Sequence, residues 1–316
     1  MTSSVETWLY STAHPESRAL PSVTTTDPIT TYSVGSSLRS YVLYLFDTTG
    51  RALGVRVEKL SPQLREVCKA TRRIRATLDL CAGDLGVSKS VVDRELAKFA
   101  DELSDVRDAQ AVADALIGAM RIAKDPYTRG LFVQWHRVAI EIRDAKMQRL
   151  LIGDPAFLLR RARLRGLRDM AASLPWSNAK REAIESSLAR SVRRAAKVRD
   201  DAAKAKGHSR HEWRRRLRKL RYQLEVVRSE LGWHLGRPED WSWPDPESVP
   251  EVIVEDVPDK LRGTIKKLGV EQDLRLVRSA LRQIGGAKPR DREHALKLVR
   301  RAIRQGNGSI VTNYPA

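Results

Sequence analysis

Residues 211–231, HEWRRRLRKLRYQLEVVRSEL, carry the clearest helical pattern in this chain. Its apolar residues recur at alternating steps of three and four, the spacing of one face of an α-helix. They are Trp213, Leu217, Leu220, Leu224, Val227 and Leu231. His211, Arg215 and Arg218 fall on the opposite side of such a helix, flanked by Arg214, Lys219 and Arg221. The stretch therefore predicts a helix with one face in a core and one strongly basic face.

The same pattern occurs earlier in the chain, in LREVCKATRRIRATLDLC at residues 64–81. Arg72-Arg73-Ile74-Arg75 corresponds to Arg218-Lys219-Leu220-Arg221. Arg65, Lys69 and Arg72 lie opposite the apolar stripe, which consists of Leu64, Val67, Thr71, Ile74, Leu78 and Cys81. Two cationic helices of one design indicate an internal repeat.

A second repeated pair follows in the same order. Leu96, Leu103, Arg107-Asp108, Val112 and Leu116 match Leu261, Leu268, Gln272-Asp273, Val277 and Leu281. We therefore expect two related helical halves. Asp108 and Asp273 are candidates to brace arginines by bidentate pairing, although an ordinary surface ion pair or a helix-interior Asp explains them equally well.

The fold class expected from composition and proline placement is all-α. Aromatic residues are only 6% of the chain, which argues against a β-barrel or sandwich. Proline is absent from 63–125 and from 176–237, where Ala, Leu, Arg and Lys dominate. Helices are predicted near 36–47, 63–82, 89–124, 127–152, 155–174, 177–206, 208–232, 258–285 and 289–305.

The predicted domain organisation is one helical domain, residues 34–306, between two tails. Residues 1–33 form a mobile Ser/Thr-rich tail and residues 307–316 a C-terminal tail. The halves span about 34–152 and 155–306. The second half contains an acidic, proline-rich loop at 238–258. The favoured interpretation of this loop is a disordered insertion; the alternative is a segment that folds over the protein's own cationic surface.

Charge limits the partners. The 316 residues contain 58 Lys plus Arg against 39 Asp plus Glu, a net charge of +19. Such a balance needs an anionic partner. No 18-residue apolar window and no secretory signal are present, and Cys68 and Cys81 are too far apart along one helix to bridge. We expect a cytoplasmic protein with no membrane association. The sequence specifies no oligomeric state.

Arginine outnumbers lysine in the basic runs, which favours phosphate or sulfate ligands because the guanidinium presents a planar fork. The first-rank candidate contacts lie on the two repeated helices: Arg65, Lys69, Arg72, Arg73, Arg75, His211, Arg214, Arg215, Arg218, Lys219, Arg221 and Tyr222. Second-rank candidates lie on other helices: Arg161, Arg165, Arg168, Arg190, Arg194, Lys197, Arg300, Arg301 and Arg304. These runs form either a shared polyanion groove, the favoured interpretation, or a merely basic surface.

Catalysis has no support in the motifs. No phosphate-binding loop, nucleophile elbow or HExxH motif is present. His208 and His211 have the spacing of a metal pair, but neighbouring arginines repel a dication and no further ligands complete a site. We expect no enzyme activity, no metal and no cofactor. A histidine among arginines should have a lowered pKa that a bound polyanion raises again.

With these residues, the sequence resembles the CHAD family, the conserved histidine α-helical domain, over about residues 34–305. One family pattern is His-x-x-Arg-x-x-x-(Arg/Lys)-Arg-x-Arg-(Tyr), and the other is Leu-Gly-x-x-(Arg/Asn)-Asp. The second half matches with His211, Arg214, Arg218, Lys219, Arg221, Tyr222, Leu268-Gly269 and Asp273. The first half matches with Arg72, Arg73, Arg75, Arg107 and Asp108, but Arg65 replaces the histidine and Cys68 the next arginine.

The resemblance implies two helical bundles with pseudo-twofold symmetry around a basic central pore or groove. It implies binding of inorganic polyphosphate, and a place at polyphosphate granules. Some relatives carry a CYTH triphosphatase domain, whose Glu-x-Glu-x-Lys motif is not found here. The alternative is a nucleic-acid-binding protein that uses the same basic surface, and weak nucleic-acid binding by charge is expected in either case.

Overall fold

The computed structural model describes residues 33–55, 60–204, 208–231, 257–283 and 288–304. These ranges contain helices and no strand, which confirms the all-α class. The tail at 1–33 except Ser33, the acidic loop at 238–258 except its last two residues, and the C-terminal tail at 307–316 lie outside them. Within the described ranges, no helix is both long and apolar enough to cross a bilayer.

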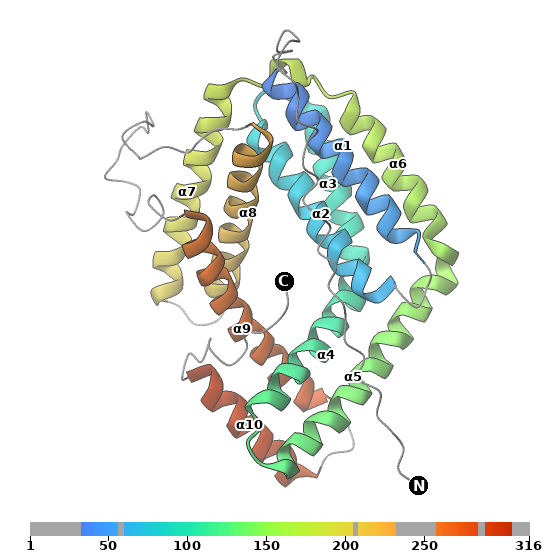
Figure 1. Ribbon diagram of the computed structural model, residues 1–316, viewed down its shortest axis with the longest axis vertical. Helices are drawn as coiled ribbons and strands as arrows, with labels where there is room; N and C mark the ends of the chain where they lie inside the picture. Colours follow the sequence, from blue (N-terminus) through green and yellow to red (C-terminus); the bar gives the residue numbers. More distant parts are fainter. Residues whose placement is uncertain (1–32, 56–59, 205–207, 232–256, 284–287, 305–316) are drawn as a thin grey trace, which may run out of the picture. The chain divides into compact units, whose positions relative to one another are not determined.

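Ten α-helices make up the described chain (Figure 1). They are α1 (Val34–Leu53), α2 (Leu60–Leu80), α3 (Gly86–Glu102), α4 (Ser104–Ile122), α5 (Pro126–Gly153), α6 (Leu158–Ala172), α7 (Arg181–Lys204), α8 (His208–Glu230), α9 (Val257–Gln283) and α10 (Pro289–Arg304). Two short 3₁₀ turns, Pro155–Phe157 and Trp176–Asn178, precede α6 and α7. Helix α5 begins where expected, because Pro126 occupies its first turn and Asp125 accepts a hydrogen bond from the amide of Thr128.

The single helix expected at 89–124 is wrong: the chain breaks at Leu103 into α3 and α4. The break lies close to the boundary between two hydrophobic cores, since Val106 of α4 still packs in the core of α3. Phe99 and Leu103 lie in one hydrophobic cluster, whereas Leu116 and Ala119 lie in another.

The first core joins α1, α2, α3, α6, α7 and α8, and the second joins α4, α5, α9 and α10. Each core therefore takes helices from both halves of the sequence. The apolar stripe of α2 is buried in the first core from Leu64 to Cys81, with no member more than 1% exposed. The stripe of α8 is buried from Leu217 to Val227, with Trp213 and Leu231 packed at its ends. Both predicted core faces are confirmed.

The two cationic helices pack directly against each other. Helix α8 contacts α2 and α9, and α4 contacts α9 and α2, so these four helices follow one another around the middle of the helical unit (Figure 1). Gln223 on α8 is fully buried and donates a hydrogen bond to the carbonyl of Ala76 on α2, at 3.4 Å. The twofold relation between the halves stays a prediction.

Candidate functional site: an arginine cluster between α2 and α8

Most of the first-rank cations are held by carboxylates. On α2, Arg65 pairs with Asp114 of α4, and Arg75 pairs with Asp93 of α3 at 2.9 Å. On α8, Lys219 pairs with Asp79 of α2 at 2.5 Å. Four more ion pairs complete the set: Lys69–Glu66, Arg73–Glu225, Arg215–Glu212 and Arg221–Glu225. These residues tie helices together or stabilise their own helix.

Three arginines differ. Arg72 on α2 and Arg214 and Arg218 on α8 have no ion pair or hydrogen-bond partner for their side chains among the residues that the structure describes. All three are half-buried. The Nε–H groups of Arg214 and Arg218 are withdrawn from solvent without an acceptor. We call Arg72, Arg214 and Arg218 the arginine cluster.

The members of the arginine cluster are close enough to repel one another. The pKa of Arg218 is lowered to about 9, first by burial and then by the charges of Arg214 and Arg72. Burial also lowers the pKa of Arg214; Arg72 acts in the same direction and Asp273 opposes it. Desolvated like charges with unpaired donors are unfavourable by themselves, and an anion that accepts those donors removes the cost.

Asp273 of α9 faces this cluster but does not neutralise it. Burial raises its pKa to about 6, against the lowering effects of Arg214 and Arg65. No ion pair joins Asp273 to another described residue. Its expected bidentate bracing of an arginine is therefore absent here. Asp108 forms the ordinary surface ion pair that was the alternative: its exposed carboxylate accepts two hydrogen bonds from the neighbouring Arg107 on a single oxygen, Oδ1, from Nε at 3.0 Å and from Nη2 at 2.9 Å.

Arg107 lies near the arginine cluster, although it is not among the contacts predicted from the sequence. Its charge lowers the pKa of Arg218, and it also acts to lower the pKa of the nearby Cys68 thiol. Burial raises the pKa of Cys68, with the arginines opposing. Cys68 stands where the family pattern has an arginine, so the cation at this place comes from α4 instead. The signal in the sequence was the repeated Arg107-Asp108 pair.

Gly269 provides the space that Arg214 occupies. A Cβ at this position would lie 2.9 Å from Nη2 of Arg214. Gly269 of the family pattern therefore has a direct structural use, since a side chain there would have to displace the guanidinium group of Arg214.

The remaining first-rank residues are His211 and Tyr222. His211 lies at an exposed position one turn before Arg214 and Arg215. Its pKa is lowered, first by burial and then by Arg215, Arg214 and Arg218, which is the predicted direction. Tyr222 is only 4% exposed, and its ring packs beneath the guanidinium groups of Arg73 and Arg221, at 5.5 and 5.1 Å. Tyr222 therefore stabilises these two arginines by cation–π interactions and is too buried to offer its ring to a ligand.

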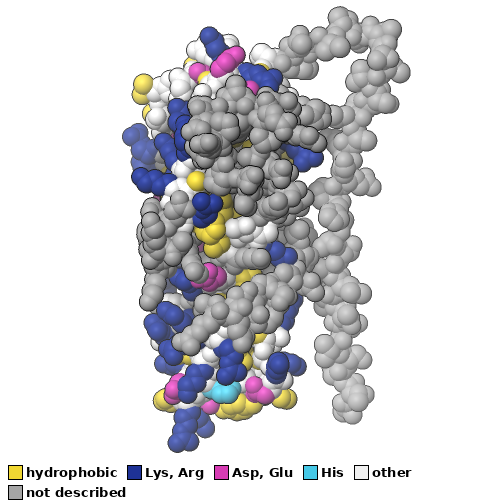
Figure 2. Space-filling model, turned by 90° about the vertical axis from the view of Figure 1, so that its left-hand side faces the viewer, with side chains coloured by type: hydrophobic (Ala, Val, Ile, Leu, Met, Phe, Trp, Pro, Cys, Tyr) yellow, Lys and Arg dark blue, Asp and Glu magenta, His cyan; other side chains and the backbone are white. Residues whose placement is uncertain are grey.

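The second-rank residues do not gather at the arginine cluster. Arg161, Arg165 and Arg168 lie on α6, which packs against α1 and α3, and Arg168 pairs with Asp47 at 2.7 Å. Arg190, Arg194 and Lys197 are exposed on α7, and Arg300 and Arg301 are exposed on α10. On the face of the molecule with α7 and α10, Lys and Arg side chains are scattered (Figure 2). The side chains of His208 and Arg304 lie outside the described residues.

The described residues offer no metal site. They contain no group of three or more His, Cys, Asp or Glu side chains that could hold an ion. Cys68 and Cys81 are both buried and free. The described chain instead brings together the guanidinium groups of the arginine cluster, on helices α2 and α8 that ion pairs with carboxylates hold in place.

Fold and site together define an all-helical protein with a cationic cluster between two repeated helices. A model of the CHAD domain family matches residues 49–237, and the chain belongs to this family. Among solved structures, the crystal structure of the CHAD domain from the plant Ricinus communis is similar at 15% identity, with a TM-score of 0.58, over 87% of this chain and 88% of that one. PptA from Streptomyces chartreusis is similar at 18% identity, with a TM-score of 0.52, over 86% and 98%. No curated protein matches the chain.

Proposed function

We propose that this protein binds inorganic polyphosphate without transforming it, and that the arginine cluster is the centre of the binding surface. One observation carries the proposal: Arg72, Arg214 and Arg218 lack a carboxylate partner among the described residues, while the cations around them on α2 and α8 are paired. Family membership supports the choice of polyphosphate, because the CHAD family suggests this ligand.

The binding chemistry follows from the donors. Each guanidinium offers a planar fork to phosphate oxygens, and charge-assisted hydrogen bonds are about twice as strong as neutral ones. The buried Nε–H groups of Arg214 and Arg218 would gain acceptors. A linear polyanion can contact α2 and α8 at once, so its second contact is intramolecular, and counterions are released as it binds.

His211, Arg107 and the paired cations have secondary roles in this proposal. His211 would take up a proton as phosphate approaches, because a nearby anion raises a histidine pKa. Arg65, Lys69, Arg73, Arg75, Arg215, Lys219 and Arg221 would contribute long-range attraction, since their carboxylate partners already occupy part of their donors. A cytoplasmic location, at polyphosphate granules, completes the proposal.

The test compares two double variants that lose the same charge. Arg72→Ala with Arg218→Ala removes two members of the arginine cluster. Arg137→Ala with Arg149→Ala removes two exposed arginines of α5. We expect the first pair to weaken binding of a long polyphosphate chain by ~100-fold at 0.15 M salt and to flatten its salt dependence, and the second pair to change affinity by less than ~3-fold. Equal effects of the two pairs would refute the site.

Two rival functions are tested with the parent protein. Excess polyphosphate should displace labelled DNA or RNA, while nucleic acid should barely displace polyphosphate; the reverse order would favour the nucleic-acid reading. Incubation of polyphosphate with Mg²⁺ or Mn²⁺ should release no orthophosphate. Release that is abolished by changing one carboxylate would make the protein a hydrolase instead. Chains of graded length should bind more tightly until one chain contacts both helices, and then level off.

A further inference from the structure

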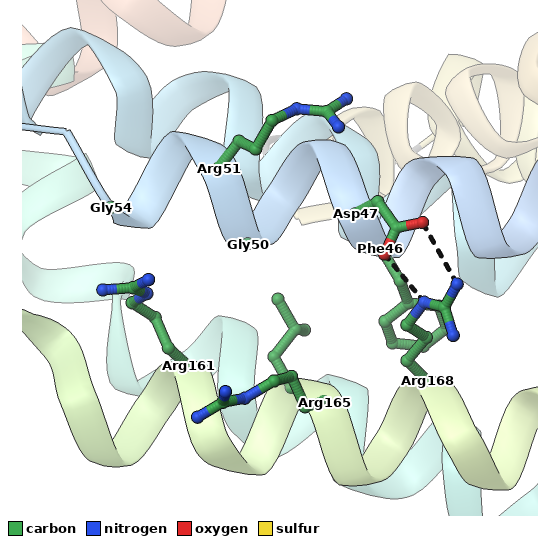
Figure 3. Close-up of a pocket in the computed structure, with 9 residues that line it drawn as sticks. Phe46, Asp47, Gly50, Arg51, Gly54, Arg161, Arg165 and Arg168 are labelled. Atoms are coloured by element: carbon green, nitrogen blue, oxygen red, sulfur yellow. Dashed lines mark hydrogen bonds and ion pairs between the residues drawn. The ribbon is translucent and has the colours of Figure 1, made fainter.

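A pocket of about 510 Å³ lies between α1 and α6, away from the arginine cluster (Figure 3). We call it the α1–α6 pocket. Helix α1 contributes one wall and α6 the other; the lining residues are Phe46, Asp47, Gly50, Arg51, Gly54, Arg161, Leu164, Arg165 and Arg168. Its volume falls within the range of ~300–1,000 Å³ that is typical of small-molecule sites.

The pocket exists because α1 has no side chains where α6 carries long ones. Gly50 of α1 and Gly54, the residue that directly follows the helix, lie four residues apart on the side toward α6. A Cβ at Gly54 would lie 3.5 Å from Cζ of Arg161, and a Cβ at Gly50 would lie 4.0 Å from Cδ2 of Leu164. Phe46 and Leu164 also line the pocket; both side chains are buried and form its apolar part.

The charges in the pocket are unbalanced. Arg168 is neutralised by Asp47, through hydrogen bonds of 2.7 and 3.2 Å. Arg161 and Arg165 have no ion-pair or hydrogen-bond partner within the described part of the chain. Both side chains line the pocket: Figure 3 shows the guanidinium group of Arg161 in the space between the helices and that of Arg165, an exposed residue, lying along α6, whereas Arg51 extends away from α6. Arg51 is also engaged with the hydroxyl of Thr48, at 3.2 Å.

Two unpaired arginines that line one pocket indicate an oxyanion, because each guanidinium fork presents several N–H donors that an anion can accept. Residues i and i+4 of a helix are ~5–6 Å apart at Cβ. At ~30 Å³ for one water molecule, the cavity is also far larger than the five heavy atoms of orthophosphate need. The spacing and the size fit two linked phosphoryl groups.

We propose that the α1–α6 pocket binds a diphosphate group, as free pyrophosphate or as part of a nucleoside diphosphate, through Arg161 and Arg165. The site is independent of the arginine cluster. Helix α6 packs on α1 and α3, whereas the cluster lies on α2 and α8, so each site has its own donors. The proposal stands even if the arginine cluster binds something other than polyphosphate.

The test uses isothermal titration of the full chain with pyrophosphate and, separately, with ADP, in Mg²⁺-free buffer. Arg161→Ala with Arg165→Ala removes the donors. Gly50→Leu fills the pocket and leaves every charge in place, while Gly50→Ala adds only a Cβ at ordinary contact distance. Arg137→Ala with Arg149→Ala is the charge-matched control. Circular dichroism melts establish that each variant is folded.

We expect the Arg161 and Arg165 pair and Gly50→Leu each to weaken binding by ~10-fold or more, with Gly50→Ala and the α5 pair within ~2-fold of the parent. Tighter binding of ADP than of pyrophosphate would identify a nucleoside diphosphate as the source of the group, and the opposite order would identify free pyrophosphate. Arg72→Ala with Arg218→Ala should leave this binding in place.

Three results would overturn the inference. Equal weakening by the α6 and α5 pairs would mean general charge attraction. A lower melting temperature without loss of binding would mean that Arg161 only stabilises the C-terminal end of α1. Loss of pyrophosphate binding in the Arg72 and Arg218 variant alone would assign all binding to the arginine cluster, which would leave the proposed function intact.

Discussion

Replacing Arg218 by methionine should make the protein more stable and a weaker polyphosphate binder. Methionine keeps an unbranched apolar side chain for packing and removes the charge. Because the pKa of Arg218 in the folded protein lies below that of the unfolded chain, the charged side chain costs stability at every pH below about 9. Its Nε–H, which has no acceptor among the described residues, adds to that cost.

The size of the effect follows from the pKa. A fall from 12.5 to about 9 corresponds to up to about 5 kcal/mol, at about 1.4 kcal/mol for each tenfold change in proton affinity. Water still reaches part of the half-buried side chain, and Arg214 and Arg72 continue to repel each other after the substitution. We therefore expect Arg218→Met to raise the free energy of unfolding by about 1–3 kcal/mol at pH 7.

Urea denaturation at pH 7 in phosphate-free buffer measures this change. Lys219→Met is the matched control on the same helix: it breaks the ion pair with Asp79, so it should lower the free energy of unfolding by about 1 kcal/mol. Added long-chain polyphosphate should raise the melting temperature of the parent more than that of Arg218→Met. An Arg218→Met protein that is less stable than the parent would refute the reasoning, because Arg218 would then be a structural residue.

Three further predictions follow from the same structure. Asp273→Asn should flatten the stability profile between pH 4 and 6, because the raised pKa of Asp273 makes its contribution present at low pH and lost as the pH rises through about 6; urea titrations at several pH values would show it, and an unchanged profile would contradict it. Polyphosphate should raise the lowered pKa of His211, so affinity should increase as pH falls from 8 to 5.5, and a pH-independent affinity in a His211 NMR and binding titration would exclude this coupling. Gly35→Ala should destabilise the fold by at least ~2 kcal/mol, since its Cβ would lie 1.8 Å from the carbonyl oxygen of Trp176; urea denaturation tests this, and a neutral result would mean that the 3₁₀ turn before α7 moves freely.

Much of the fold was predictable because the spacing of apolar residues along a helix can be read directly from the sequence. The stripe from Leu64 to Cys81 and the stripe from Leu217 to Val227 are buried as expected, and prolines marked segment edges correctly. The break at Leu103 was not predictable, since nothing local interrupts the helical pattern there. It lies just before the place where the apolar face of α4 passes from the first core, at Val106, to the second core, at Ala113.

The sequence predicted which basic residues lie on the two cationic helices, but not which of them are paired with carboxylates. Both cationic helices were identified, and they do pack together. Which cations are free depends on carboxylates from other helices: Asp79 for Lys219, Asp93 for Arg75 and Glu225 for Arg73. Those partners are distant in sequence or on another helix, so spacing within one helix could not reveal them.

What the sequence by itself determined is the helical class, the two basic helices and the excess of arginine, because helix periodicity and charge are properties of short stretches. Three features depend on how the helices pack: Arg72, Arg214 and Arg218 remain without carboxylates among the described residues, Arg107 from α4 stands near Cys68, and Gly50 and Gly54 leave a pocket against α6. The physical reason is that burial, ion pairing and empty space are created between helices, where the partner of a side chain is fixed by packing.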